Sequence, residues 1–204
     1  MDEQDVPSPI DLCDPSDALE WERTAQARPG RAEIFQAFGR ELGALGKRPL
    51  TVLELGSGPG FLADYLLNAA PEIRLTLLDF SAPMHHLARA RLGQRAGEVT
   101  HVVRNFKEPG WSQGMGPFDA VITNQAVHEL RHKRHAARLH AAVKDILKHG
   151  APYLVSDNFF EEGGLGNDQL NMTVAEQRDA LLYAGFSEVA LVVTAGRLVM
   201  HRAT

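Results

Sequence analysis

The chain has 204 residues, of which 44% are hydrophobic, and carries a formal net charge of −5. This length suits one well-cored domain and is short for two. The negative charge disfavours a nucleic-acid partner, because nucleic-acid binders usually present a basic surface to the phosphates. The single basic run, residues 131–138, is predicted to be a solvated helix face.

The sequence also lacks the marks of a membrane or exported protein. It has no apolar run long enough to span a membrane, and its acidic N-terminus does not resemble a signal peptide. Cys13 is the only cysteine, which excludes an intramolecular disulfide. We therefore expect a cytoplasmic protein with no membrane partner. The sequence does not indicate its oligomeric state.

The first 48 residues are predicted to lie outside the main domain. Residues 1–16 are rich in Asp, Pro and Ser, which predicts a flexible tail. Residues 17–27 predict a short helix, which Pro29-Gly30 ends. We assign residues 1–48 as a tail and helices that cover the substrate. The second helix has an apolar face at helical spacing, formed by Ile34, Phe35, Phe38, Leu42 and Leu45.

From residue 50, strand-like apolar runs alternate with helical patterns, which is typical of a parallel sheet covered by helices. Only Ala195-Gly196 joins the last two runs, so these should form an antiparallel hairpin. The sequence thus predicts a Rossmann-like, doubly wound α/β domain, residues 49–204, with a mostly parallel seven-stranded sheet and an antiparallel terminal hairpin. Expected strands cover residues 50–55, 73–78, 99–103, 118–123, 153–156, 188–194 and 197–201. Expected helices cover residues 61–69, the segment that Ser81 caps, residues 129–148, and the segment from the Thr173 capping box to Ala184.

A glycine-rich loop after the first strand reads Glu54-Leu55-Gly56-Ser57-Gly58-Pro59-Gly60. Such a loop lets a nucleotide cofactor approach the backbone at the carboxyl edge of the sheet. Asp79 ends the next strand, where a carboxylate accepts hydrogen bonds from both ribose hydroxyls. A dinucleotide loop needs a glycine where Phe61 stands, and Glu54 would repel a pyrophosphate. The pattern therefore favours S-adenosylmethionine, a sulfonium with an ammonium group, over NAD.

From about residue 50 to 202, the chain resembles the class I S-adenosylmethionine-dependent methyltransferases. The resemblance rests on the glycine loop, residues 77–81 with Met84, residues 118–128 and the terminal hairpin. It implies an enzyme that binds S-adenosylmethionine through Glu54, Gly56, Ser57, Gly58, Gly60, Asp79, Phe80, Met84, Asn124 and Gln125. By this resemblance, Glu54 lies near the ammonium group, Asp79 holds the ribose, and Phe80 and Met84 flank the adenine.

One stretch departs from the family pattern. The family often has an acid after the third strand, which accepts a hydrogen bond from the adenine amino group, and this chain has Asn105-Phe106 there. The Asn105 amide is able to accept or donate in that position. We therefore expect Asn105 and Phe106 to be the cofactor contacts at the adenine.

The segment His128-Glu129-Leu130-Arg131-His132 matches the zinc-protease pattern H-E-x-x-H. We predict no metal here, because basic side chains flank it and it falls where the resemblance expects a loop. His128 is instead the catalytic candidate, since a neutral imidazole near the transferred methyl takes a proton from an acceptor. The alternative is a histidine that only caps a helix or binds the loop, because donor–acceptor alignment supplies much of the rate. Asp157-Asn158, a pair that some relatives use for Mg²⁺, lacks its acidic partner at Asn124.

The parts outside the predicted core are small, which favours a small-molecule acceptor. They are the N-terminal region and residues 158–172, where Phe159, Phe160 and Gly163-Gly164 suggest a lid. One alternative function is a catalytically silent S-adenosylmethionine-binding partner subunit. Others are a zinc metallohydrolase that uses His128, Glu129 and His132, and an NAD-dependent oxidoreductase.

Overall fold

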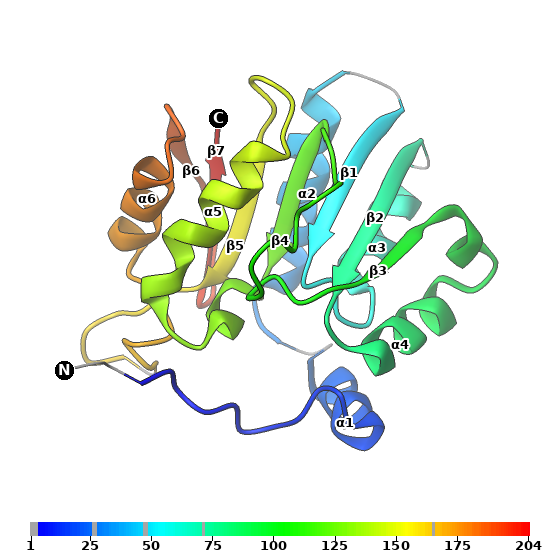
Figure 1. Ribbon diagram of the computed structural model, residues 1–204, viewed down its shortest axis with the longest axis horizontal. Coiled ribbons are helices and arrows are strands. Elements are labelled where there is room, and N and C mark those ends of the chain that lie inside the picture. The colour runs from blue at the N-terminus through cyan, green and yellow to red at the C-terminus, as the bar shows by residue number, and fades with distance from the viewer. Residues whose placement is uncertain (1–3, 26–27, 47–48, 71, 165) are drawn as a thin grey trace.

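Within the described residues, seven strands form one sheet in the order β3-β2-β1-β4-β5-β7-β6 (Figure 1). The computed structural model describes residues 4–25, 28–46, 49–70, 72–164 and 166–204. The strands are β1 (Leu50–Leu55), β2 (Ile73–Asp79), β3 (Thr100–Val103), β4 (Ala120–Asn124), β5 (Tyr153–Asn158), β6 (Val189–Ala195) and β7 (Leu198–Ala203). Strands β1 to β5 pair in parallel, whereas β7 pairs antiparallel with both β5 and β6. The predicted fold class is confirmed.

Helices cover both faces of the sheet, with α5 and α6 in front and α2 behind in the view of Figure 1. They are α1 (Pro15–Ala25), α2 (Arg31–Ala44), α3 (Phe61–Ala69), α4 (Ala82–Leu92), α5 (Ala136–Asp145) and α6 (Val174–Tyr183), with short 3₁₀ helices η1 (Gly93–Glu98), η2 (Val127–Leu130) and η3 (Lys133–His135). Side chains of β1 alternate between two cores. Val52 packs with Phe38 and Leu66 on one face, and Leu53 packs with Val143 on the other. The predicted end of the first helix, Ala27, lies outside the described residues.

The sheet has its topological switch point between β1 and β4, which are parallel neighbours. The connections from these two strands lead to opposite sides of the sheet, so a crevice opens at their carboxyl ends. The backbone N–H groups of Gly56 and Ser57 both donate to the Leu78 carbonyl, at 2.8 and 3.2 Å. These bonds fix the glycine loop against the end of β2.

The predicted long helix over residues 129–148 is wrong. The chain forms η2 and η3 first, and α5 begins only at Ala136. Arg131 interrupts the helix because it adopts a left-handed conformation, with φ of 67°. Its guanidinium donates to the carbonyls of Val6 and Pro7, and its own carbonyl accepts from the Val6 N–H. Contacts with a distant segment thus override the local helical pattern.

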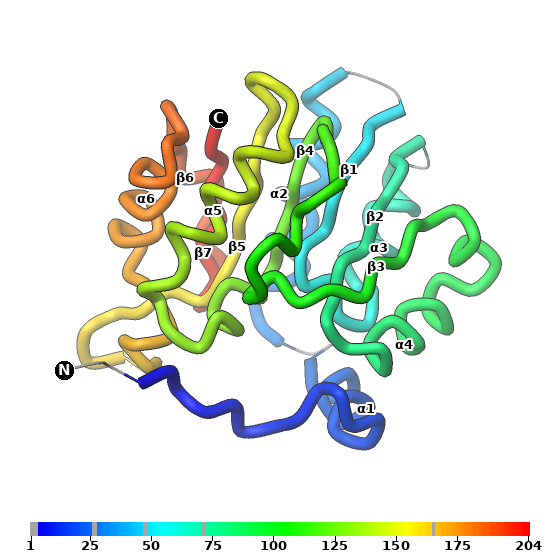
Figure 2. The backbone as a smooth tube through the Cα atoms, in the orientation of Figure 1, coloured from blue at the N-terminus to red at the C-terminus, as the bar shows by residue number. Residues whose placement is uncertain are grey.

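The N-terminal segment, residues 4–14, is docked on the domain and does not behave as the predicted flexible tail. Figure 2 shows it running along the carboxyl edge of the sheet to α1. Val6 and Pro7 of this segment bind Arg131, and farther along the segment the Leu12 carbonyl accepts a hydrogen bond from Ser81 Oγ. Glu22 of α1 then pairs with Arg91 of α4 at 2.5 Å. Residues 1–3 of the predicted tail lie outside the described residues.

In the described part of the chain, no helix combines the length and the apolar character needed to cross a membrane.

Candidate active site

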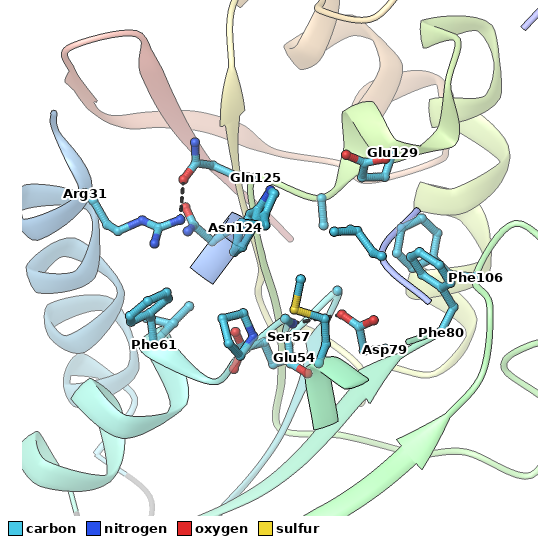
Figure 3. Close-up of a pocket in the computed structure, with 18 of the residues that line it drawn as sticks. Arg31, Glu54, Ser57, Phe61, Asp79, Phe80, Phe106, Asn124, Gln125 and Glu129 are labelled. Carbon is cyan, nitrogen blue, oxygen red and sulfur yellow. Dashed lines mark hydrogen bonds between the residues drawn. The ribbon is translucent and has the colours of Figure 1, made fainter. Parts of the chain in front are cut away.

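A pocket of about 650 Å³ lies at the switch point of the sheet (Figure 3). Residues at the ends of β1, β2 and β4 and in the segments that follow β1 to β4 form most of it, and the N-terminal segment with α1 and α2 also contributes. The lining residues are Leu12, Trp21, Arg31, Phe35, Glu54, Gly56, Ser57, Gly58, Pro59, Phe61, Leu62, Asp79, Phe80, Met84, Phe106, Asn124, Gln125, Ala126 and Glu129.

Two glycines in the loop after β1 are required by close contacts. A Cβ atom on Gly56 would lie 2.4 Å from the Cβ atom of Ala126, and a Cβ on Gly60 would lie 3.1 Å from that of Ala88. Both glycines also have positive φ angles, 63° and 78°. Gly56 therefore lets the β4 loop close over the pocket, and Gly60 lets α3 start against α4.

Asp79 is held at the pocket edge by backbone donors. Its Oδ2 accepts from the Gly58 N–H at 2.8 Å, and its Oδ1 accepts from the Ser81 N–H at 2.9 Å. Burial raises the pKa of Asp79, and the backbone hydrogen bonds from Ser81 and Gly58 act in the opposite direction. Each carboxylate oxygen has capacity for a further hydrogen bond, so the group is suited to receive hydroxyl donors from a ligand.

Glu54 presents an unpaired carboxyl group to the pocket. Its side chain is buried, with 3% exposed, and Oε2 has no hydrogen-bond partner among the described residues. Burial and the charge of Asp79 together raise the pKa of Glu54 to about 8, against the lowering effect of Arg31. A buried carboxyl without a partner favours a ligand that brings a positive charge or a donor to it.

The structure adds pocket residues that the sequence patterns did not indicate. Arg31 comes from α2, Phe61 from the start of α3 and Glu129 from η2, whereas Trp21 of α1 lies in the region that was expected to cover the substrate. Arg31 is the most unusual, because its guanidinium is buried with only 7% of the residue exposed. A possible signal was its position beside Pro29-Gly30, at the start of a helix otherwise apolar on that face.

Most predicted cofactor residues line this pocket, and three predicted site residues do not. The ten that line it are Glu54, Gly56, Ser57, Gly58, Asp79, Phe80, Met84, Phe106, Asn124 and Gln125. Gly60 instead allows the close contact between the start of α3 and Ala88 of α4. The Asn105 Oδ1 accepts from the Lys107 N–H at 3.0 Å and so shapes its own loop. The third is His128, which lies behind the pocket wall. The predicted lid residues Phe159 and Phe160 are also absent from the lining.

His128 is clamped between two carboxylates. Its Nδ1 lies 2.7 Å from Asp157 Oδ1, and its Nε2 lies 3.4 Å from Glu129 Oε1. Burial by itself would lower the pKa of His128, but Asp157 and Glu129 outweigh it and raise the pKa to about 10. The predicted neutral imidazole is therefore wrong, because this residue is protonated at neutral pH. Its catalytic role stays a prediction, and a base function would require it to lose that proton first.

The helix that a zinc site in H-E-x-x-H would need is not formed. The left-handed Arg131 separates His128 from His132, and His132 Nδ1 accepts from the Arg134 N–H as the cap of η3. Among the described residues, no group of three or more His, Cys, Asp or Glu side chains is arranged to hold a metal ion.

The basic run 131–138 is not the solvated helix face that we expected. Lys133 pairs with Glu176 at 2.7 Å, and Arg134 pairs with Asp5 at 2.5 Å. Arg131 is buried and lies 3.4 Å from Glu129 Oε2. Much of the positive charge is thus used within the molecule, where it fixes the N-terminal segment and the loop after β4.

A family model described as a methyltransferase domain matches residues 53–153. This segment contains the glycine loop, Asp79 and the β4 loop, which together build the pocket floor. The chain therefore belongs to the class I S-adenosylmethionine-dependent methyltransferases, and the predicted family is confirmed.

Two curated relatives are ribosomal RNA small subunit methyltransferase C proteins. The one from Cronobacter sakazakii is 38% identical over 78 residues, 38% of this chain and 22% of that protein. The one from Klebsiella pneumoniae is 34% identical over 113 residues, 53% of this chain and 31% of that protein. The chain thus spans less than a third of the length of these relatives. Their names point to a nucleic-acid substrate and contradict our prediction of a small-molecule partner and no nucleic acid.

Solved methyltransferase structures share the fold. PigF, solved with S-adenosylhomocysteine, superposes with a TM-score of 0.75 at 16% identity, covering 94% of this chain and 60% of that one. Human N-acetylserotonin methyltransferase in complex with S-adenosylmethionine gives a TM-score of 0.71 at 17% identity, covering 93% of this chain and 56% of that one. Magnesium protoporphyrin IX methyltransferase from Synechocystis gives a TM-score of 0.64 at 18% identity, covering 86% of this chain and 80% of that one.

The clamp around His128 predicts an imidazole that titrates only in alkaline solution. Nitrogen-15 NMR should find both ring nitrogens protonated at neutral pH, with deprotonation near a pH of about 10. Because folding raises this pKa, the stabilisation is fully present below about 6.5 and is lost as the pH rises through about 10. Asp157→Asn should lower the pKa, whereas Asp145→Asn, at an exposed position of α5, should leave it unchanged. An imidazole neutral at pH 7 in the wild type would contradict this geometry.

Proposed function

We propose that this chain binds S-adenosylmethionine in the pocket at the switch point and transfers its methyl group to an acceptor. The observation that carries the proposal is the pair of buried carboxyl groups, Glu54 and Asp79, on the floor of one pocket beside the glycine loop. When bound, the cofactor would supply an electrophilic methyl group: the acceptor forms a bond to the methyl carbon as the carbon–sulfur bond breaks, with S-adenosylhomocysteine as the leaving group.

The chemistry of the pocket matches the parts of this cofactor. Asp79, fixed by the Gly58 and Ser81 N–H groups, is placed to accept from the ribose hydroxyls. Phe80, Met84 and Phe106 give an apolar surface for a purine ring. The unpaired Glu54 carboxyl suits an ammonium group and disfavours a pyrophosphate. These features support S-adenosylmethionine over NAD.

The acceptor is expected on the side of the pocket formed by Gln125 and Glu129. These residues stand on the loop after β4, across from Glu54 and Asp79 in Figure 3. His128 and Arg131 lower the pKa of Glu129 against the effect of burial, so its carboxylate is charged at neutral pH. The names of the curated relatives make small-subunit ribosomal RNA the first acceptor to test.

The cofactor assignment predicts binding of S-adenosylhomocysteine, the reaction product, without binding of NAD. In calorimetric titration we expect micromolar affinity, and Asp79→Ala should weaken it by about tenfold or more, since it removes a charge-assisted acceptor for the ribose. Asp64→Ala, at a half-buried position of α3 that does not line the pocket, is the matched control. If S-adenosylhomocysteine does not bind, or NAD binds equally well, the proposed cofactor is wrong.

The raised pKa of Glu54 predicts that ligand binding releases a proton. Below a pH of about 8 the free carboxyl is protonated, and an approaching ammonium group stabilises its ionised form. Affinity should therefore rise by up to about tenfold per pH unit as the pH increases towards 8. Titrations in phosphate and Tris buffers, which have different ionisation enthalpies, measure the released proton. Glu54→Gln should abolish the release, and an unchanged release in this variant would assign the proton elsewhere.

The methyl-transfer assignment predicts incorporation of labelled methyl groups into an acceptor. Unmodified small-subunit ribosomal RNA, free or within the subunit, is incubated with tritiated S-adenosylmethionine and the purified protein. We expect label in the RNA with the wild type and little with Asp79→Ala. Label in low-molecular-weight compounds of a cell extract, with none in RNA, would exclude this acceptor and retain the transfer. No label in any fraction, with cofactor binding intact, would favour a silent binding subunit.

A further inference from the structure

Two buried ionisable side chains, one basic and one acidic, line the same pocket, and each has polar atoms without a hydrogen-bond partner among the described residues. The Nε and Nη1 atoms of Arg31 and the Oε2 atom of Glu54 have no hydrogen-bond partner among the described residues. Both side chains line the pocket, and both residues are more than nine-tenths buried. A buried donor or charge without a partner is costly. The two groups therefore predict a ligand that carries both complementary charges.

Burial and neighbouring positive charges lower the pKa of Arg31. Burial and, to a lesser extent, repulsion by Arg28 and Arg91 lower the pKa of Arg31 to about 10, against the raising effect of Glu54. The guanidinium remains charged at neutral pH. It lies 5.1 Å from the centroid of the Phe61 ring, so an aromatic face partly replaces the lost hydration.

Gln125 holds the guanidinium in place. Its Oε1 accepts from Arg31 Nη2 at 3.0 Å, as the dashed line in Figure 3 shows. Gln125 has a φ of 55°, a left-handed conformation that is unfavourable for a residue with a side chain. Its backbone N–H donates to the Ser156 carbonyl at 2.8 Å, which stabilises this turn. The turn directs the amide towards α2, and the Nε and Nη1 atoms of the guanidinium keep no hydrogen-bond partner among the described residues.

We propose that Arg31 binds the carboxylate of the cofactor's amino-acid group, that Glu54 binds its ammonium group, and that Gln125 is the positioning residue for Arg31. This inference rests on the proposed function. The α-amino acid group of S-adenosylmethionine carries both charges on adjacent atoms, and a planar guanidinium binds a carboxylate through two parallel hydrogen bonds. Arg31 lies outside the matched segment 53–153. The N-terminal helices thus take part in cofactor recognition as well as covering the pocket.

The test compares two ligands that differ only in the amino-acid portion. S-adenosylhomocysteine carries it, and 5′-methylthioadenosine keeps the nucleoside and thioether without it. In calorimetric titration, Arg31→Met should weaken the affinity for S-adenosylhomocysteine by about 10- to 100-fold. The affinity for 5′-methylthioadenosine should stay within about twofold of the wild-type value. Gln125→Met should give a smaller loss, again only for S-adenosylhomocysteine. The matched control is Arg40→Met, an exposed arginine on the same helix α2 that does not line the pocket and should change neither affinity.

A thermal melt separates ligand binding from a structural role. Because Arg31 is an uncompensated buried charge in the free protein, Arg31→Met should melt no lower than the wild type without ligand. The wild type should gain more stability than the variant from S-adenosylhomocysteine. Unchanged S-adenosylhomocysteine affinity in Arg31→Met, or equal losses for both ligands, would overturn the inference while the proposed function stands. A wild type that binds no S-adenosylhomocysteine would overturn the proposed function and the inference with it.

Discussion

The contact between Gly56 and Ala126 is the constraint on which the pocket depends. The loops after β1 and β4 meet there, and no side chain fits between them, since a Cβ on Gly56 would lie 2.4 Å from that of Ala126. The same loop is held by two hydrogen bonds to Leu78 at the end of β2. A larger residue at Gly56 would separate β1 from β4 and move the glycine loop, whose Gly58 N–H group binds Asp79. Because interiors are close-packed, that displacement would not remain local.

Charge, more than shape, distinguishes the walls of this pocket. Glu54 and Asp79 lie on one side, Glu129 lies on the other, and Arg31 is the buried cation between the helices and the loops. In a site with little water, such fixed charges act more strongly than at the surface. Glu129 is in turn part of a chain of charges that continues through His128 to Asp157. The side of the pocket at Glu129 therefore carries a negative charge that His128 and Arg131 partly neutralise.

The parts of the site that were predictable are those encoded by neighbours in sequence. The glycine loop and Asp79 follow from local spacing at strand ends, and the alternation of strands and helices indicates the sheet. Arg31 was not predictable, because its burial depends on Gln125, which is 94 positions away. The state of His128 depends on Asp157, 29 positions away. The break before α5 likewise depends on bonds between Arg131 and the N-terminal segment, and a helical pattern contains no information on those.

The docked N-terminal segment and α1 have a consequence for how such a domain diversifies. Leu12 and Trp21 form part of the pocket wall, yet they belong to a stretch that contributes no strand to the sheet. Substitutions there alter the wall facing the ligands without disturbing strand pairing or the glycine loop. Ligand preference is therefore able to change through the first few dozen residues while the sheet stays constant. A fragment starting at β1 would keep its core strands and expose the cofactor floor to solvent.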